Sequence, residues 1–466
     1  MFRVTLDPSS LQPLTDQIVG EIRKRIVQRA IKSEARLPSI RQFAETHSVA
    51  SSTVVAAYDR LAQEGFLKAR KGSGYYVAPK ARPSATGTHV ALNEAEDVLW
   101  IVRRSMTDDK TLIKAGAAWL PPEWQAQDAV RQALLNIAAD GVTSALSYGE
   151  PRGLGALRTL LSSRLSSVGI NASPEQIILT HGASQAIDLV ARFLVKSGDA
   201  VLVDDPGYST TFGLLKMLGA RVYGVPRTPQ GPDLAALETL MTEHRPKLLF
   251  TTAAMHNPTS TSMTQANAYQ VLRLAEKFKT IIVEDDNYGE LDDKVHVRLA
   301  ALDQLQRVIY IAGFSKSMAK GLRAGYLAAS QDIVESLLDI KLLTGLTTSG
   351  LNEQIVYEII SSGAYDRHLV KLRKRLDQKR QVVSRKLRDL GMEFFGEPDA
   401  GMFIFAKSPH ITNTAQFASN AEKQGVLMGP GHLFRPHMES SPWLRFNVAY
   451  CDHPAVYALL KPDAEL

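Results

Sequence analysis

Residues 308–325 read VIYIAGFSKSMAKGLRAG, and this stretch decides the fold. The apolar run 308–311 predicts a strand, and a loop that carries Lys316 and Arg323 follows it directly. Lys316 would therefore project at the mouth of a sheet. A lysine with a lowered pKa can bond covalently to an aldehyde, and Arg323 could clamp a phosphate of the same ligand. By themselves the two residues fit a solvated basic loop better than a cofactor site.

Further apolar runs predict the rest of that sheet. They occupy residues 177–180, 200–204, 247–251 and 281–284, and segments with helical patterns separate them. Nearly continuous apolar strands that alternate with helices are typical of a mostly parallel sheet buried on both faces. In such α/β sheets ligands bind at the carboxyl ends of the strands, which is where the polar motifs of this sequence fall.

The run 281–284 leads into a carboxylate pair and a tyrosine. A buried Asp285 could face a pyridine nitrogen and keep the ring protonated, while the Tyr288 hydroxyl could bind a ring oxygen. Asp286 competes for the first role, because neighbouring residues near a strand end point to opposite faces. The three-residue step to Tyr288 favours Asp285.

Other loops add matching groups. Gly182, Ala183 and Ser184 open a helix directly after a strand, where free backbone N–H groups could cradle a phosphate. Tyr208 follows a turn and could stack on a flat ring, and Asn257 puts an amide donor in a loop.

From about Leu112 onward the chain resembles the fold-type I pyridoxal-phosphate enzymes, specifically the class I/II aminotransferases. The resemblance implies that Lys316 forms an internal aldimine with pyridoxal 5′-phosphate, that Asp285 pairs with the pyridine nitrogen, and that Tyr288 and Asn257 bind the ring oxygen. It also implies the remaining contacts: Tyr208 stacks on the ring, Gly182, Ala183, Ser184, Ser315 and Arg323 hold the phosphate, Arg445 binds an effector carboxylate, and Tyr148 reaches the phosphate from the other subunit. The sequence departs from the family pattern at Gly313, where a hydroxyl residue is common, and at Ser260, where glycine is usual. A fold of this type that no longer binds the cofactor is the alternative.

The first 80 residues hold the surplus charge of the chain. They carry 13 Lys and Arg against 7 Asp and Glu, whereas the other residues are neutral overall. This distribution indicates an anionic partner for that piece, although a solvated basic face is the alternative. Apolar spacing predicts helices from Leu14, over residues 40–47 after the cap Ser39, and after a cap in residues 51–53. Strands at 66–68 and 75–77 with a basic turn between them complete a winged helix-turn-helix.

This piece resembles the GntR family of bacterial repressors, through the motif around Arg36–Ala44, through Val49, Thr53 and Val54, and through the glycines of the wing. The resemblance implies DNA contacts from seven positions: Arg36, Arg41, Ser51, Ser52, Thr53, Lys71 and Gly72. The family usually has a Ser-Arg pair where this chain has Ala50 and Ser51, so a phosphate-contacting arginine is missing there. A winged helix that mediates only protein contacts is the alternative.

We therefore expect an α/β protein in three parts: a winged helix-turn-helix at residues 1–78, a linker at 79–93, and an aminotransferase-like domain at 94–466. This architecture resembles the MocR subfamily of transcription regulators. It implies a homodimer that binds double-stranded operator DNA and senses pyridoxal phosphate, an amino compound, or both through aldimine formation. An active aminotransferase with an accessory DNA-binding domain is the alternative from another class, and a regulator that responds to the cofactor alone is a third possibility.

The amino-acid composition excludes several other classes of protein. Of 466 residues 45% are apolar and 22% charged, which is typical of a globular protein rather than a disordered one. The single cysteine, Cys451, excludes a disulfide scaffold. The eleven histidines show no metal-ligand spacing, so we expect no metal site. No apolar run approaches the ~20 residues of a membrane span and no signal peptide opens the chain, so we expect no membrane partner and a cytoplasmic location.

Overall fold

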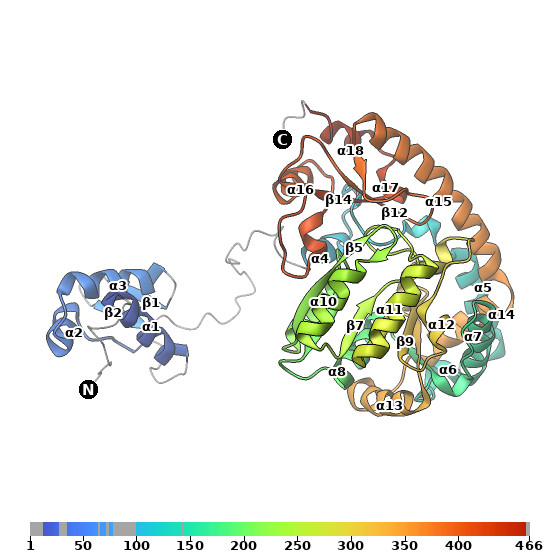
Figure 1. The fold of residues 1–466 in the computed structure, drawn as a ribbon, viewed down its shortest axis with the longest axis horizontal. Helices are drawn as coiled ribbons and strands as arrows, with labels where there is room; N and C mark the ends of the chain where they lie inside the picture. Colours follow the sequence, from blue (N-terminus) through green and yellow to red (C-terminus); the bar gives the residue numbers. More distant parts are fainter. Residues whose placement is uncertain are drawn as a thin grey trace. The chain divides into compact units, whose positions relative to one another are not determined.

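The computed structural model describes residues 13–27, 35–63, 66–70, 74–77, 99–141 and 143–462 (Figure 1). By its internal contacts the chain divides into two compact units, residues 1–91 and 92–466. The predicted linker at 79–93 lies outside the described residues.

The N-terminal unit contains the three predicted helices and the predicted hairpin. The helices are α1 (Leu14–Val27), α2 (Ile40–His47) and α3 (Ser51–Gln63), and strand β1 (Leu67–Arg70) pairs antiparallel with β2 (Gly74–Val77). Their apolar faces meet in one core, in which Ile22, Tyr58 and Leu61 are fully buried. The spacing of the apolar residues therefore produces a winged helix-turn-helix, as predicted.

The helix starts in this unit confirm one predicted cap and correct another. The Ser39 hydroxyl accepts a hydrogen bond from the Gln42 amide at 3.2 Å, so Ser39 caps α2 as predicted. The prediction of a cap in residues 51–53 is wrong, because α3 already begins at Ser51. Thr53 donates its backbone N–H to the carbonyl of Ala50, and the three hydroxyl residues lie in the first turn of the helix.

The C-terminal unit is built on an eight-stranded sheet with the order β3-β10-β9-β8-β7-β4-β5-β6. Its strands are β3 (Ile177–Thr180), β10 (Gly325–Ala328), β9 (Val308–Gly313), β8 (Ile281–Asp285), β7 (Leu248–Thr251), β4 (Ala200–Asp205), β5 (Arg221–Thr228) and β6 (Gly231–Pro232). The strands from β9 to β5 run parallel, while β10 runs antiparallel to both of its neighbours. The mostly parallel sheet predicted from the sequence is thereby confirmed.

Helices cover both faces of this sheet (Figure 1). Val201 and Val203 of β4 pack in a core with α8 (Ala183–Leu194), α9 (Ser209–Met217) and α13 (Gln331–Gly345). Leu202, between them, packs in a separate core on the other face. That second core includes residues of α5 (Gln127–Asp140), α7 (Gly155–Ser167), α10 (Leu234–His244), α11 (Gln265–Phe278), α12 (Leu299–Asp303) and α14 (Gly350–Ser361). Burial on both faces explains why the strand sequences are apolar almost throughout.

A smaller antiparallel sheet follows, with the order β11-β12-β14-β13. Its strands are β11 (Glu393–Phe394), β12 (Phe403–Lys407), β14 (Trp443–Asn447) and β13 (Gly429–Pro430). The long helix α15 (Ala364–Asp389) leads into this sheet, and α4 (Trp100–Met106), α16 (Thr414–Lys423), α17 (Val448–Cys451) and α18 (Pro454–Leu459) share its core. Within the described ranges no helix is both long and apolar enough to cross a membrane.

Candidate functional site

A pocket opens where β8, β9 and the start of α8 meet. Nine of the residues predicted for a cofactor site line it: Ala183, Ser184, Tyr208, Asn257, Asp285, Tyr288, Ser315, Lys316 and Arg323. Ile187 and Asn287, which the sequence reasoning missed, line it as well. The pocket therefore brings together residues that span 141 positions of the sequence.

Lys316 follows β9 and is largely enclosed. Its Nζ donates a hydrogen bond to the carbonyl of Ala118 at 2.8 Å and lies 5.4 Å from the ring centre of Trp119 and 5.8 Å from that of Tyr288. Burial lowers the pKa of Lys316 to about 7, the nearby Arg445 adds to the effect, and Asp285 opposes it. Much of the amine is therefore neutral and nucleophilic near neutral pH, which addition to an aldehyde requires.

The two neighbouring carboxylates face different surroundings. Asp285 lines the pocket, and its Oδ1 accepts hydrogen bonds from the backbone N–H of Asn287 at 3.1 Å and from the side-chain amide of that residue at 2.5 Å. Burial raises the pKa of Asp285 to about 6, although the Asn287 donors pull it down. Asp286 instead accepts hydrogen bonds from Arg298 at 2.6 Å and Tyr310 at 2.7 Å, away from Lys316. The geometry thus favours Asp285 over Asp286 as the carboxylate of the pocket.

At the start of α8 the pocket has the form of an anion cradle. Gly182 precedes the helix with φ +74°, and a Cβ at this position would lie 2.9 Å from Nη2 of Arg323. Arg323 donates to the Ser315 hydroxyl and to the carbonyl of His181, both at 3.2 Å. A helix N-terminus beside a guanidinium and two serine hydroxyls suits a phosphate.

Arg445 lies on β14 with 3% of its surface exposed. Its Nη1 donates to the side-chain oxygen of Asn257 at 2.7 Å, and the rings of Phe403 and Phe434 lie 4.8 and 4.5 Å from its guanidinium carbon. Burial lowers the pKa of Arg445 to about 10. Among the described residues no carboxylate lies within the 4.0 Å of an ion pair with this cation, so the site suits an anionic ligand.

A buried polar network that the sequence reasoning missed supports two loops of the pocket. Asp204 of β4 accepts hydrogen bonds from Arg227 of β5 at 2.9 Å and from the hydroxyl of Thr251 of β7 at 3.0 Å. His256, next to Asn257, lies 3.6 Å from the same carboxylate, and burial lowers its pKa well below the usual value. The network joins β4, β5 and β7, and Asp204, Thr251 and His256 line one small cavity together with Tyr208. The only signal in the sequence was the acidic end of the run 200–204.

Tyr148, which was predicted to contact the cofactor, does not line the pocket of its own chain. It is 83% exposed and is not among the residues that line the cavity.

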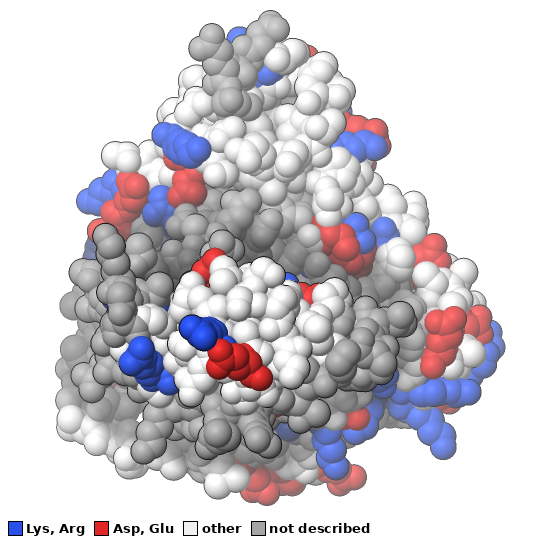
Figure 2. Space-filling model, turned by 90° about the vertical axis from the view of Figure 1, so that its left-hand side faces the viewer, with Lys and Arg blue, Asp and Glu red and all other residues white. Residues whose placement is uncertain are grey.

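The N-terminal unit presents several of the predicted DNA contacts at its surface. Arg36, Arg41, Ser51 and Ser52 are exposed, while Thr53 is half-buried. Arg41 donates to Glu45 at 3.0 Å one helical turn away, and Figure 2 shows basic and acidic side chains beside one another on the face it displays. Lys71 and Gly72 of the wing lie outside the described residues.

Comparison with known proteins identifies both units. A family model described as aminotransferase class I and II matches residues 122–461, and the chain belongs to that family. A second model, described as bacterial regulatory proteins of the gntR family, matches residues 14–77. The predicted combination of a GntR-type winged helix with an aminotransferase-like domain is confirmed.

Relatives share both units and carry the names of regulators. YisV of Bacillus subtilis, an HTH-type transcriptional regulator, is 28% identical over 450 residues, which cover 94% of this chain and 93% of YisV. YdcR of Escherichia coli is 26% identical over 443 residues, covering 93% and 94% of the two chains. NorG of Staphylococcus aureus is 26% identical and covers 86% of this chain and 92% of its own length. The chain therefore has the architecture of MocR-like regulators.

Solved structures match the C-terminal unit. The kynurenine aminotransferase of Pyrococcus horikoshii, solved in complex with PMP, superposes with a TM-score of 0.72 at 26% identity and covers 78% of this chain and 93% of its own. LysN, the α-aminoadipate aminotransferase of Thermus thermophilus, has a TM-score of 0.70 at 24% identity, covering 78% and 92%. The second match establishes the fold alone.

Proposed function

We propose that this protein is a DNA-binding transcription regulator that binds pyridoxal 5′-phosphate and responds to an amino compound bound beside it. The observation that carries the proposal is the pocket around Lys316, in a chain that also holds a GntR-type domain. A neutral lysine amine, a carboxylate and an anion cradle form one cavity there, which is the set of groups the cofactor needs. Because its other ligand is DNA, we place the protein in the cytoplasm.

The residues of the pocket fit the cofactor by shape as well as by chemistry. The absence of a side chain at Gly182 leaves room beside Arg323, where the phosphate would lie with Ser184 and Ser315 as hydroxyl donors. Tyr208 would stack on the ring, and Tyr288 and Asn257 would bind its oxygen. When bound, the cofactor supplies an aldehyde carbon and a ring that withdraws electrons from it.

Asp285 and Lys316 would divide the proton chemistry of the site. With a pKa of about 6, Asp285 is mostly ionised at neutral pH and can hold a proton on the ring nitrogen. The two hydrogen bonds from Asn287 fix Oδ1 of Asp285 and leave its second oxygen for the ring. Lys316 keeps a neutral amine available, and Arg445 would bind the carboxylate of an amino-acid-like effector.

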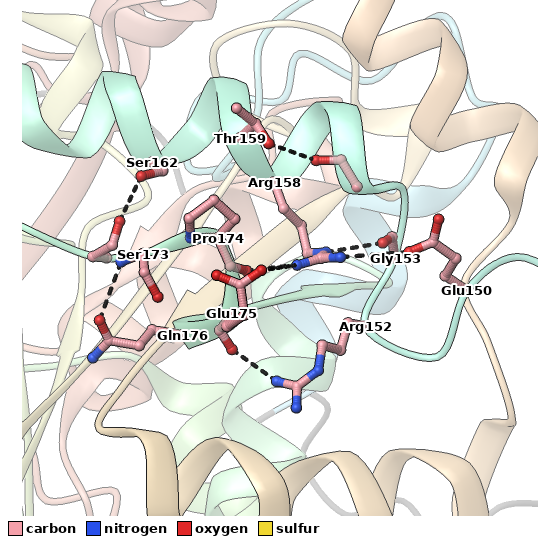
Figure 3. A network of polar contacts seen from close by, with 12 residues as sticks. Glu150, Arg152, Gly153, Arg158, Thr159, Ser162, Ser173, Pro174, Glu175 and Gln176 are labelled. Atoms are coloured by element: carbon pink, nitrogen blue, oxygen red, sulfur yellow. Dashed lines mark hydrogen bonds and ion pairs between the residues drawn. The ribbon is translucent and has the colours of Figure 1, made fainter.

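We further propose that the regulator is a homodimer in which Tyr148 completes the pocket of the partner. The loop after Tyr148 is fixed from several sides, as Figure 3 shows: Arg158 reaches from α7 and donates to the carbonyls of Gly153 at 3.0 Å and Pro174 at 2.7 Å. Lys341 donates to the carbonyl of Pro151 at 2.7 Å. A rigid loop that nonetheless leaves its tyrosine exposed favours a contact with a second copy.

Exposed apolar residues near this loop support the same interface. Gly149 lies against Thr348 and Gly350 lies against Ser144, so the two segments are adjacent. The large apolar side chains exposed on these segments and on the end of α13, which leads into the second segment, are Leu146, Tyr148, Leu343 and Leu346. Apolar side chains gathered in this way mark interaction surfaces. A Leu343→Glu variant should be monomeric by light scattering, and a Leu343→Glu variant that stays dimeric would exclude this face.

Titration and DNA binding test the proposal together. The purified full chain should develop visible absorbance with added pyridoxal phosphate. Duplexes obtained by selection from random DNA should then be bound with an affinity that differs between the free, cofactor-loaded and amino-acid-treated protein. A response to the cofactor alone would make the cofactor the signal. Protein that stays colourless, or DNA affinity that is identical in all three states, would refute the proposal.

An active aminotransferase with an accessory DNA-binding domain is the second candidate. The 26% identity to a kynurenine aminotransferase over 78% of the chain favours it. The two functions differ in turnover. Keto acid formed over many cycles from an amino-acid panel would identify an enzyme, whereas a stable spectral change without keto acid would identify a sensor.

A further inference from the structure

Residues 113–120, which we call the strap, contact two candidate ligand-binding side chains: Lys316, which lines the pocket, and Arg445, which lies beside Asn257 of the pocket. Backbone hydrogen bonds hold the strap to the segment between α16 and β13: Ile113 donates to the carbonyl of Gly425 at 2.8 Å and Gly116 donates to that of Leu427 at 2.7 Å. A Cβ on Gly116 would lie 2.1 Å from the backbone nitrogen of Gly429, so only glycine permits this approach. The strap is therefore packed backbone against backbone.

Five consecutive carbonyls of the strap are occupied, and two of their partners belong to the candidate site. The Gly116 carbonyl accepts from Arg445 Nε at 3.2 Å and Nη2 at 2.6 Å, and the Ala118 carbonyl accepts from Lys316 Nζ at 2.8 Å. The carbonyls between and around them, those of residues 115, 117 and 119, all accept from Asn447.

Asn447 is the anchor of this arrangement. It is fully buried on β14, two residues after Arg445, so both side chains lie on one face of the strand. Its side-chain amide donates to the carbonyls of Ala117 and Trp119, both at 2.9 Å, and its backbone N–H donates to that of Ala115 at 2.6 Å. None of these contacts involves an atom of the proposed cofactor.

The acceptors of Arg445 explain why this arrangement can change. Two guanidinium N–H groups converge on one neutral oxygen of Gly116, whereas a carboxylate offers two charged oxygens in the fork geometry that arginine prefers. A ligand carboxylate at Arg445 would therefore compete with the Gly116 carbonyl and win. The Gly116 carbonyl then loses its charged donors, while Asn447 still holds the carbonyls on either side.

We propose that Asn447 is a positioning residue that holds the strap so that the Gly116 carbonyl occupies Arg445 until a ligand carboxylate displaces it. The displacement frees the strap at Gly116, while Asn447 keeps the carbonyls on either side in place. The chain continues from the strap toward its N-terminus through α4, and Lys114 donates to the carbonyl of Thr107 at the end of that helix at 2.9 Å. A ligand bound at Arg445 therefore affects the strap first, and the strap is the part of the site that leads through α4 toward the DNA-binding unit in the sequence.

The inference rests on the proposed cofactor site, and two probes separate the two claims. Pyridoxamine 5′-phosphate carries no carboxylate, whereas N-(5′-phosphopyridoxyl)-L-leucine has the same ring with a leucine, and hence a carboxylate, attached through nitrogen. Hydrogen exchange of the full chain should show the strap amides exchanging about tenfold faster with the second probe than with the first, because a hydrogen bond to a charged group contributes roughly that factor to local stability. Equal or slower exchange with both probes bound would overturn the inference. Failure of both probes to bind would refute the cofactor site itself.

Variants of Asn447 test whether the difference in strap exchange between the two probes depends on this residue, which a purely structural role would not predict. Asn447→Asp keeps the shape of the side chain but loses both donated hydrogen bonds, so the strap should exchange fast with either probe and the difference between probes should vanish. Asn267→Ala removes a buried amide that donates to the Pro232 carbonyl at 2.9 Å, and it should retain the full difference. A difference that survives in Asn447→Asp would overturn the role of Asn447. The comparison of the two probes on the unaltered chain stands even if this variant fails to fold.

Discussion

The lowered pKa of Lys316 predicts how fast the protein reacts with pyridoxal phosphate at each pH. With a pKa of about 7, close to half of the amine is neutral at pH 7. A lysine at its ordinary value of 10.5 is neutral in only about one molecule in 3,000 at the same pH. Because the neutral amine is the nucleophile, the rate of chromophore formation should rise about tenfold between pH 6 and pH 8, in proportion to the neutral fraction, and then level off.

The causes of the shift predict opposite effects for two substitutions. Arg445 disfavours the charged amine, so Arg445→Leu should move the midpoint of the rate profile upward. Asp285 favours the charged amine, so Asp285→Asn should move the midpoint downward even where it weakens binding. Stopped-flow absorbance with excess cofactor measures all three profiles, and Lys316→Ala should give no chromophore. A rate that keeps rising about tenfold per pH unit up to pH 10 would refute the assignment of a buried, partly neutral amine.

Four further predictions concern stability, the anion cradle, DNA and the dimer. Lys316→Met should raise the stability of the cofactor-free protein at pH 7 by roughly 4 kcal/mol, because a lysine whose folded pKa is lowered costs stability below its unfolded pKa. The gain should shrink as the pH rises toward 10.5, and a drop in melting temperature at pH 7 would contradict this prediction. Gly182→Ala should weaken cofactor binding about tenfold in an absorbance titration, because φ is +74° at this position and the new methyl group would contact Arg323. The control Gly198→Ala, at φ +87° with open space around it, should bind the cofactor normally. Equal affinities of the two variants would show that Gly182 is not part of the cradle. Arg41→Ala should weaken DNA binding and lower the salt slope by about one unit, while Arg131→Ala, which breaks a comparable exposed pair with Asp128 on α5, should leave the slope unchanged. Tyr148→Phe should weaken cofactor binding only in the dimer, as a titration at several protein concentrations would show, and an effect that persists in the monomer would argue against a contact between subunits.

Local sequence patterns were sufficient to predict the strands and most of the pocket. The runs that became β3, β4, β7, β8 and β9 each carry the apolar residues that a strand covered on both faces needs. Asp285 ends β8, and Lys316 lies in the loop that follows β9. The step from Asp285 to Tyr288 favoured the carboxylate that now lines the pocket.

Contacts between distant segments were beyond these patterns. The antiparallel strand β10 inserts between β3 and β9, and nothing in its four residues signals that direction. Asn287 lines the pocket through hydrogen bonds to Asp285 that depend on the turn after β8. The strap contributes backbone carbonyls, which every residue has, so apart from the glycine required at position 116 its role leaves no trace in residue types. The start of α3 was misplaced because Ser51 favours both a cap and a first turn.

Reductive trapping tests the central claim most directly. The full chain is incubated with pyridoxal phosphate and reduced with borohydride, and its proteolytic peptides are analysed by mass spectrometry. A phosphopyridoxyl group on Lys316 and on no other lysine is the expected result. Label on a different lysine, or on none, would contradict the assignment of this pocket as a cofactor site.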